Sequence, residues 1–478
     1  FDNRYLGRYV QYFSNATAEN EWDRYGYVAN NDQGGEIWKM AYFSLGLNIT
    51  RMQEKAVAEE RHDITGMAKV IRAWSWQVAT DYHSELIDFD QAFTQRMSFD
   101  YVGQEKVYAE ILRLINEGVT DLARTDGKVS ASYAAVGDKM YNGDRAKWTK
   151  FAWGIVARNL NNQINKSTYN ADAVIAACDK SLASNTDNAL INYNGSVSAD
   201  SNFNGPGRNN ISLFRQTDFM VRVMDGTVFT GAVDPRMSRI LAPSIGLSEA
   251  SPASTAIPDP TKYTFVGNPL NTTASSTTSP SRIPNLWGTF STGTVTTPGR
   301  YIFRDKASFP IMTYAEIQFI KAEAAFKKGD KTLALAAYKK GIEASIDFVN
   351  LNTVVSTSYP ITSAITATEK NTFLANLNVV PAEANLTMSH IILQKYISLF
   401  GFGNLEAWTD MRKYHYDNVN IYKTMAFPTL LFADNGGKLP YRVRPRFNSE
   451  YVWNFASLQA IGADKVEYHT VEMWFSKP

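Results

Sequence analysis

The chain has 478 residues, of which 44% are hydrophobic and 20% are charged, a balance that excludes disorder along most of its length. Lys and Arg number 48 against 47 Asp and Glu, so a net charge of +1 argues against a general binder of nucleic-acid backbones. The single cysteine, Cys178, excludes an internal disulfide framework and a zinc site built from several cysteines. No stretch approaches the roughly 20 apolar residues that span a bilayer.

Helical segments dominate the first third of the chain. Residues 38–61 and 65–82 are long and poor in glycine, and both predict helices. Residues 104–124 place their apolar side chains on one face at the helical period. The short polar connections between such segments predict antiparallel helical hairpins.

Two further helices have recognisable starts. Asp144 is expected to cap a helix over residues 145–166. Asn170 or Asp172 is expected to cap the helix that runs through Leu182.

The composition changes after Leu190. More than half of residues 248–299 are Ser, Thr, Pro or Gly, which cannot form a packed helix and is typical of functional or flexible loops. Aromatic residues in this region indicate that part of it folds, and we expect residues 301–303 to form a short strand.

Helices resume near Thr313. Residues 314–328 and 332–348 predict a helical hairpin. The small and aromatic positions of a tetratricopeptide hairpin, without its usual final proline, are matched by Ala322, Ala334, Tyr338 and Gly341.

The last part of the chain carries fewer helix signals. Thr366 and Glu369 form a predicted capping box, and residues 389–400 predict another helix. The tail after Lys423 is rich in Pro, Arg and aromatic residues, and we expect it to be irregular.

Residues 313–325 (TYAEIQFIKAEAA) and 337–345 (AYKKGIEAS) resemble the SusD/RagB family of nutrient-binding outer-membrane lipoproteins, and its SusD-like type 2 branch most closely. Five more stretches agree with this family in order along the chain: 143–152 (GDRAKWTKFA), 234–237 (DPRM), 392–401 (ILQKYISLFG), 405–412 (LEAWTDMR) and 439–446 (LPYRVRPR). Trp148, Phe151, Tyr396 and Trp408 match these motifs, and we expect them to be buried core residues that contact no ligand.

The resemblance implies a mainly α fold, in which about four tetratricopeptide-like helical hairpins cradle a loop-rich half with a few short strands. Residues 1–478 would form one composite fold. Its parts are expected to be helical hairpins (36–190), an irregular Ser/Thr/Pro-rich insert that faces the ligand (191–312), a tetratricopeptide-like hairpin (313–349), and further helices with an irregular tail (350–478).

The resemblance also implies a role. Family members bind glycans or other nutrients, including peptides, at the cell surface and deliver them to a SusC-like TonB-dependent transporter. A lipid anchor on a cysteine upstream of Phe1 would hold such a protein to the outer membrane. Nucleic acid is not an expected partner.

Catalytic signatures are absent from the sequence. It contains no G-x-S-x-G elbow, no P-loop, no H-E-x-x-H and no G-x-G-x-x-G after a strand. None of the five histidines is followed by another at a helical metal-binding spacing. His83, at a predicted helix end, could transfer protons, although a surface histidine stabilised by the helix dipole is the simpler interpretation. We therefore expect no enzyme, no cofactor and no metal site.

Three features leave alternatives open. Neighbouring carboxylates such as Glu19 with Glu21, or Glu59 with Glu60, could serve a glycosidase, but adjacency does not establish the required separation. Asp32 and Asp200 could join a calcium site, although neither lies in a spaced loop of oxygen ligands. Cys178 is expected to be an inert core thiol.

Sugar binding would require aromatic rings in polar, non-periodic segments, with amide, carboxylate or guanidinium groups beside them. One segment fits best and continues into a loop rich in polar residues; its candidate ligand contacts are Trp22, Asp23, Arg24, Tyr25, Tyr27, Asn30 and Asp32. The alternative is a set of rings that packs against the first helix. On the first interpretation Trp22 is exposed, and its loss should weaken binding without unfolding the protein.

Two further segments offer candidate contacts. Trp287 and Phe290 lie in a polar loop, where Trp287 could instead anchor that loop to the helical half. Arg208 lies in a glycine-rich segment and could approach a ligand, but an ordinary solvent-exposed turn would account for this residue equally well.

The leading hypothesis is therefore a non-catalytic protein that binds oligosaccharide at the cell surface. A tetratricopeptide-like scaffold that binds only proteins or peptides is the alternative, and a glycoside hydrolase is the third. Aromatic side chains exposed together, a continuous apolar groove, or two converging carboxylates would distinguish the three.

Overall fold

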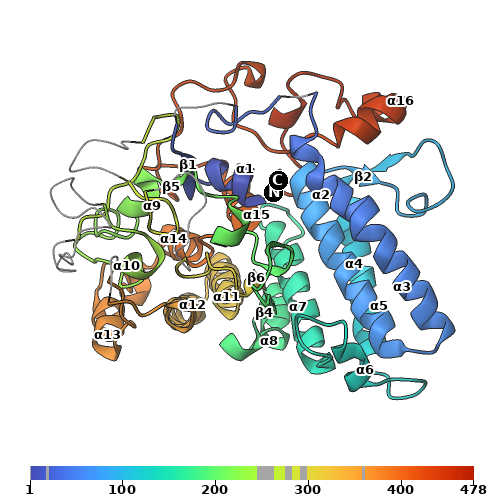
Figure 1. The fold of residues 1–478 in the computed structure, drawn as a ribbon, viewed down its shortest axis with the longest axis horizontal. Coiled ribbons are helices and arrows are strands. Elements are labelled where there is room, and N and C mark those ends of the chain that lie inside the picture. Colours follow the sequence, from blue (N-terminus) through green and yellow to red (C-terminus); the bar gives the residue numbers. More distant parts are fainter. Residues whose placement is uncertain are drawn as a thin grey trace.

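The computed structural model describes residues 2–17, 21–28, 30–244, 263–274, 283–290, 299–357 and 361–478. The described part is mainly helical, with only two-stranded sheets between the helices (Figure 1). The mainly α fold expected from the sequence is confirmed.

Nine longer helices form most of the framework. They are α3 (Gly46–Ala58), α4 (His62–His83), α5 (Gln104–Ala123), α7 (Arg145–Asn162), α8 (Ala171–Lys180), α11 (Tyr314–Lys328), α12 (Lys331–Asn352), α14 (Met388–Ser398) and α15 (Asn404–Lys413). Shorter helices are α1 (Asp2–Tyr9), α2 (Glu36–Lys39), α6 (Ala131–Ala135), α9 (Asp218–Arg222), α10 (Met237–Ile240), α13 (Ala367–Ala375) and α16 (Phe455–Ala460).

The longer helices pack against one another in sequence order. α3 contacts α4, α4 contacts α5, and α7 contacts α8, which in turn packs on the α11–α12 hairpin. In Figure 1 these helices cross the lower part of the molecule from right to left, and the irregular segments lie above them and to the left. The N-terminal α1 packs against α15, so the first residues of the chain lie inside the fold.

The described strands form three short antiparallel pairs. β1 (Phe13–Asn15) pairs with β5 (Phe214–Gln216), and β4 (Ala189–Ile191) pairs with β6 (Phe309–Met312). β2 (Leu86–Ile87) and β3 (Tyr101–Val102) form a hairpin that projects from the helical half.

Local sequence signals set many of the helix boundaries. The Asp144 carboxylate accepts hydrogen bonds from two N–H groups of the first turn of α7, and Asn170 caps α8 in the same way. Thr366 and Glu369 form the expected capping box at the start of α13. The apolar face of residues 104–124 is buried in α5, as its period predicted.

The α11–α12 hairpin has the close helix approach expected of a tetratricopeptide-like pair. A Cβ atom on Gly341 would lie 2.9 Å from the Phe319 ring, so only glycine allows this contact. The Tyr338 hydroxyl donates to the Val379 carbonyl at 2.6 Å. Ala322 and Ala334 are fully buried beside them.

Two sequence-based expectations about elements are wrong. Residues 38–61 are not one helix, because a π-helical segment (Met40–Ser44) separates α2 from α3, and a Cβ atom on Gly46 would lie 2.0 Å from the Ala41 carbonyl oxygen. Residues 301–303 form a turn after Gly299, which has a positive φ, and not a strand.

The core follows the expectation for the motif residues. Trp148, Phe151, Tyr396 and Trp408 are all buried, and so is the thiol of Cys178. Burial raises the pKa of Cys178, which keeps the thiol protonated and inert at neutral pH.

His83 is buried, so the expectation of a surface histidine is wrong. Its Nδ1 lies 2.8 Å from the Val443 carbonyl, and burial lowers its pKa to about 4. His469 is buried as well; burial and then the charge of Arg444 lower its pKa to about 4. Both rings are therefore neutral in the native protein at neutral pH.

We predict that replacing His83 by Gln flattens the acid dependence of stability. An unfolded histidine, with a pKa near 6.5, gains its proton as the pH falls from 7 to 5, whereas native His83 does not, so each buried histidine costs stability in that window. The difference in the free energy of unfolding between pH 7 and pH 5 should shrink by about 2 kcal/mol in the variant. Urea unfolding at both pH values measures this.

Asp81 acts in the opposite direction, because burial, despite hydrogen bonds to its carboxylate, raises its pKa to about 6. Comparing variant with wild type cancels that contribution. An unchanged pH dependence in His83→Gln would contradict the neutral, buried assignment.

Candidate functional site

The Trp22 segment belongs to the core. Trp22 is only 1% exposed, and its ring centroid lies 4.4 Å from that of Tyr5, 5.2 Å from Tyr9 and 5.4 Å from Tyr27. The expectation that Trp22 is an exposed stacking platform is therefore wrong. The rings pack around α1, which is the alternative that the sequence left open.

The polar residues around Trp22 are engaged inside the protein. Asp23 is buried and forms an ion pair with Arg8 at 3.6 Å, while the Tyr25 hydroxyl donates to the Tyr9 carbonyl at 2.7 Å. The Tyr27 hydroxyl accepts from the Arg444 N–H at 2.6 Å. Arg24 is half-buried, with its guanidinium 5.9 Å from the centre of the Phe432 ring. The polar residues of this segment are therefore there to pair with other groups inside the protein and not to face solvent.

The Trp287 loop is also anchored. Trp287 is 3% exposed, and its Nε1 donates to the Asn204 carbonyl at 2.7 Å, so this ring cannot stack on a ligand either. Phe290 is half-buried. Arg208 is half-buried and donates to the carbonyls of Ser201 and Ala199, as expected of a turn.

Asn30 and Asp32 remain at the surface. Asn30 is exposed, and Asp32 is half-buried. The Asp32 carboxylate accepts from the Arg446 guanidinium at 2.7 Å, and from the side-chain and backbone N–H groups of Asn448 at 2.6 and 2.9 Å. This cluster joins two segments that lie more than 400 residues apart in the sequence.

Two glycines allow these segments to touch. A Cβ atom on Gly34 would lie 2.6 Å from the Val443 side chain, and one on Gly35 would lie 2.9 Å from Cβ of Arg446. The loop that carries Asn30 and Asp32 therefore lies flat on the C-terminal segment.

The C-terminal segment exposes aromatic side chains beyond this cluster. Trp453 is 72% exposed and Phe455 is 44% exposed. Between them, the Asn454 side chain pairs with both the N–H and the C=O of Phe99 in the β2–β3 hairpin, at 3.0 and 2.9 Å. Buried Glu450 accepts from Trp38 Nε1 at 3.1 Å.

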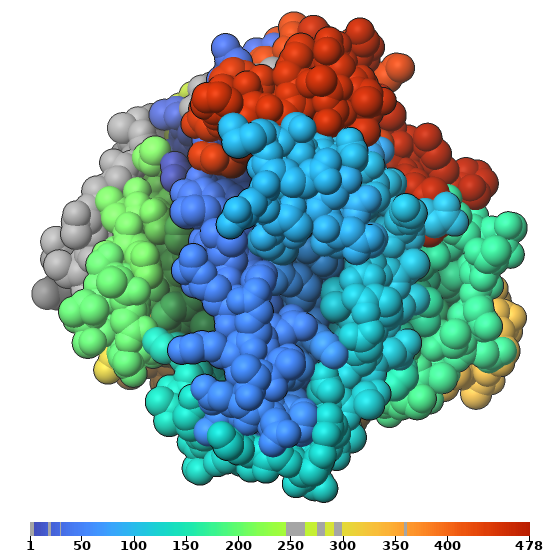
Figure 2. Space-filling model, turned by 90° about the vertical axis from the view of Figure 1, so that its right-hand side faces the viewer, coloured from blue at the N-terminus to red at the C-terminus, as the bar shows by residue number. Residues whose placement is uncertain are grey.

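These inward anchors explain why the rings point outward. Asn454 and Glu450 tie one side of the segment to the helical half, which leaves the neighbouring Trp453 and Phe455 at the surface. Figure 2 shows the C-terminal segment in orange and red above the light-blue hairpin on this side of the molecule. We call the following group of residues the rim site: the Asp32–Arg446–Asn448 cluster, Asn30 next to it in the chain, and the exposed Trp453 and Phe455 further along the C-terminal segment.

The rim site has the chemistry that a saccharide requires. An exposed indole can cover the C–H face of a sugar ring, and the amide, carboxylate and guanidinium groups can pair with hydroxyl groups. The polar cluster is held by charge-assisted hydrogen bonds, so it is preorganised for a ligand.

Trp453 and Phe455 were not predicted as candidate contacts from the sequence, although a usable signal was present. Residues 447–455 read FNSEYVWNF, in which Phe447, Tyr451 and Phe455 recur at spacings of four, while Trp453 stands off that stripe next to polar Asn454. The same criterion that selected Trp22 would have selected Trp453. Only the structure distinguishes the buried ring from the exposed one.

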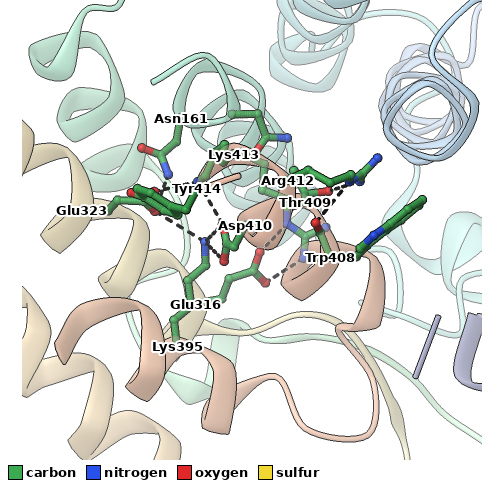
Figure 3. A network of polar contacts seen from close by, with 12 residues as sticks. Asn161, Glu316, Glu323, Lys395, Trp408, Thr409, Asp410, Arg412, Lys413 and Tyr414 are labelled. Carbon is green, nitrogen blue, oxygen red and sulfur yellow. Dashed lines mark hydrogen bonds and ion pairs between the residues drawn. The ribbon is translucent and has the colours of Figure 1, made fainter. Parts of the chain in front are cut away.

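A network of buried charges lies elsewhere, at the junction of α7, α11, α14 and α15 (Figure 3). Lys413 contacts Glu323 at 2.7 Å and Asp410 at 2.9 Å, and Lys395 contacts Asp410 at 2.8 Å. Burial alone would raise the pKa of Glu323, but Lys413 and Lys395 outweigh it and hold that pKa well below its usual range.

The network extends to the helical half. Arg158 of α7 donates two hydrogen bonds to Glu316, at 2.5 and 2.7 Å, and pairs with Glu406 at 2.9 Å. The cavity beside these groups has a volume of about 20 Å³, enough for about one water molecule and not for a substrate. The network is therefore structural.

The remaining candidates for chemistry are surface groups. Glu59 pairs with Arg61, Asp200 pairs with Lys139, and Glu19 lies outside the described residues. Within the described part of the chain, no three His, Cys, Asp or Glu side chains gather in a way that could hold a metal ion. None of the described helices combines the length and apolar character needed to cross a membrane.

Comparisons with known proteins agree on one family. A SusD-like family model, described as starch-binding and associating with the outer membrane, matches residues 2–444. A SusD/RagB family protein from Bacteroides thetaiotaomicron VPI-5482 is 20% identical, with a TM-score of 0.71 over 99% of this chain and 94% of that one. No curated protein matches the chain.

Two further solved structures resemble it. A SusD homolog from Bacteroides fragilis NCTC 9343 is 20% identical, with a TM-score of 0.72 over 99% of this chain and 95% of that one. A chitin-binding protein is 18% identical, with a TM-score of 0.71 over 99% of this chain and 94% of that one. At these identities the likeness concerns the fold.

We predict that Trp22→Ala destabilises the protein and that Trp453→Ala does not. Removing the buried Trp22 ring leaves a cavity among three tyrosines, which should lower the free energy of unfolding by about 3–5 kcal/mol. Truncating exposed Trp453 should change it by less than about 0.5 kcal/mol. Urea unfolding of the two variants provides the comparison, and equal stability would contradict the placement of Trp22.

We also predict that Lys395→Met is strongly destabilising. It leaves Asp410 and Glu323 buried with Lys413 as their remaining lysine partner, which should cost about 3–5 kcal/mol in urea unfolding. Lys328→Met is the matched control, because Lys328 pairs with Asp172 at the surface and its loss should barely move the unfolding midpoint. Equal effects of the two substitutions would show that the buried ion pairs contribute no more to the free energy of unfolding than a surface pair does.

Proposed function

Because the chain belongs to the SusD-like family, we propose that it is a non-catalytic protein of the outer-membrane surface that binds oligosaccharide at the rim site. The observation that carries this proposal is the exposed Trp453 on the same segment as the Asp32–Arg446–Asn448 cluster. Carbohydrate binding requires an accessible ring face together with fixed donors and acceptors.

The same proposal includes delivery of the ligand. The bound nutrient passes to a SusC-like TonB-dependent transporter, and a lipid anchor holds the protein at the cell surface. Support for both comes from the family resemblance and from its described association with the outer membrane. Co-purification with a β-barrel protein from native outer membranes tests the first, and metabolic labelling with a fatty-acid analogue tests the second.

Absence of catalysis is part of the proposal. Glu323 and Asp410, which converge in space, are buried against lysines beside a cavity that has no room for a substrate. Turnover of a bound glycan that a carboxylate substitution abolishes would contradict this part.

One observation favours the alternative of a scaffold that binds only protein partners. An apolar groove of about 460 Å³ lies between α3, α4 and α7, with half-buried Ile64, Ile71 and Trp74 on its walls. Such a groove suits an amphipathic helix. If Ile71→Lys abolished capture of a membrane partner while no glycan bound the wild type, the alternative would replace our proposal.

We predict that Trp453→Ala weakens oligosaccharide binding by about tenfold, since one aromatic stacking platform is worth roughly 1–3 kcal/mol by analogy with bases stacked on rings. The ligand is first identified on a glycan array that includes starch and chitin fragments, with a peptide panel beside it. Calorimetric titration of wild type and variant then gives the affinities.

The matched control is Tyr133→Ala. Tyr133 is an exposed aromatic residue on α6, which lies at the opposite end of the helical half from α16 (Figure 1). The Tyr133→Ala variant should bind the oligosaccharide with the affinity of the wild type. Equal affinities of the Trp453 variant and the wild type would move the site away from the rim, and silence of folded protein on both panels would remove the binding function.

A further inference from the structure

A second hollow opens on the loop-rich half, away from the rim site. Its walls come from the end of α9 and the turn after it (222–230), from residues 377–387, from the start of α14 and from residues 423–424. Its volume is about 650 Å³, within the usual range of roughly 300–1,000 Å³ for small-molecule sites. α14 and α16 lie in different parts of the molecule (Figure 1), so the two sites are separate.

The described lining of this hollow is cationic. Arg222 and Lys423 line it, and no Asp or Glu is among its described lining residues. Half-buried His390 also lines it, but burial lowers the pKa of His390, so its ring adds no charge at neutral pH. No carboxylate in the described part of the chain lies within ion-pairing distance of Lys423. The N-terminus of α14, which opens here, adds the positive end of its helix dipole.

Three carboxylates on the neighbouring segments are engaged by protein groups, and one of them pairs with Arg222 of the lining. Asp218 pairs with Arg222 at 3.2 Å, and Asp225 accepts the N–H of Thr227 within its own turn. Asp417 accepts the N–H groups of Val419 and Asn420. Among the described residues Lys423 therefore has no direct ion pair, although its charge helps to lower the pKa of Asp417.

The other lining groups suit a sugar. Exposed Asn385 offers its amide group, and exposed Asn378 offers its amide oxygen, since its N–H donates to the Thr230 carbonyl at 2.8 Å. The Thr387 hydroxyl is engaged with His390, and the Phe229 ring lines the hollow 6.4 Å from the His390 ring. His390 Nδ1 accepts from the Thr387 N–H, so the ring proton is on Nε2, which serves as a donor.

The backbone holds the lysine in a strained conformation. Lys423 and Thr424 have φ values of 35° and 58°, in the left-handed region that non-glycine residues rarely adopt. Arg222 donates to the Thr424 carbonyl at 3.1 Å and keeps the turn in place. Strain of this kind concentrates at ligand-binding segments.

We propose that this hollow is a second saccharide site, which binds the anionic group of an acidic sugar, either a carboxylate or a sulfate ester. The inference rests on the proposed function, because it names a ligand class for the same protein. Lys423 would supply the charge, Asn378 and Asn385 would pair with hydroxyl groups, and Phe229 would line the apolar face.

The test is calorimetric titration of the full chain with four probes: a uronic-acid oligosaccharide, a sulfated oligosaccharide, a neutral oligosaccharide of equal length and inorganic sulfate. At least one acidic saccharide should bind about tenfold more tightly than the neutral one, because hydrogen bonds to charged groups are stronger than those between neutral groups. Lys423→Gln should remove that preference. Asn385→Ala should weaken acidic binding by a smaller factor.

The controls separate this inference from the rim site. Lys128→Gln, at an exposed position between α5 and α6, should leave the preference unchanged, and Trp453→Ala should lower only neutral binding. Retention of the preference in folded Lys423→Gln would overturn the inference, as would sulfate alone binding as tightly as a saccharide. Neutral binding that depends on Trp453, with no acidic preference, would overturn this inference and leave the proposed function intact.

Discussion

The arrangement of the two halves depends on charges that are buried in the protein. Lys395 and Lys413 lie buried between α11, α14 and α15 and are held by Glu323 and Asp410. A buried charge without a partner costs several kcal/mol, so each of these helices can adopt only the register in which all four groups are paired. Arg158 extends the same constraint to α7. The network thus fixes how the helical hairpins meet the helices of the loop-rich half, and it leaves no space for a reaction.

The rim site repeats this principle at the surface. Its segments come from opposite ends of the chain, and they meet because Asp32 takes the charge of Arg446 and because glycines let their backbones touch. Buried Glu450 and Asn454 then hold the C-terminal segment against the helical half, and the Trp453 side chain between them stays exposed at the surface. A surface assembled in this way is held in place by its own contacts, and such preorganisation reduces the entropy lost when a ligand binds.

Much of the fold could be predicted because the signals for helices, their capping residues and their apolar period, are local in the sequence. Asp144, Asn170 and Thr366 cap helices with side chains adjacent in sequence, and the apolar face of α5 follows from its period. The candidate site was less predictable, because the exposure of an aromatic ring is a tertiary property. Trp22 stands among charges that turn out to be buried and paired, as Asp23 is with Arg8, whereas Trp453 stands in a similar sequence and is exposed. Asp32 could be selected from the sequence because it is polar and lies close to the aromatic residues of the Trp22 segment. Its partners Arg446 and Asn448 could not be predicted, because they lie more than 400 residues away in the sequence.

Hydrogen–deuterium exchange with and without a bound oligosaccharide tests the central claim most directly, since it maps the ligand onto the backbone without any substitution. Our account predicts slower exchange in residues 30–35 and 446–455 when a neutral oligosaccharide is added at saturating concentration, with the core helices α11 and α12 unchanged. Protection that leaves both of these segments unaffected while the saccharide is bound would contradict the assignment of the rim as the site.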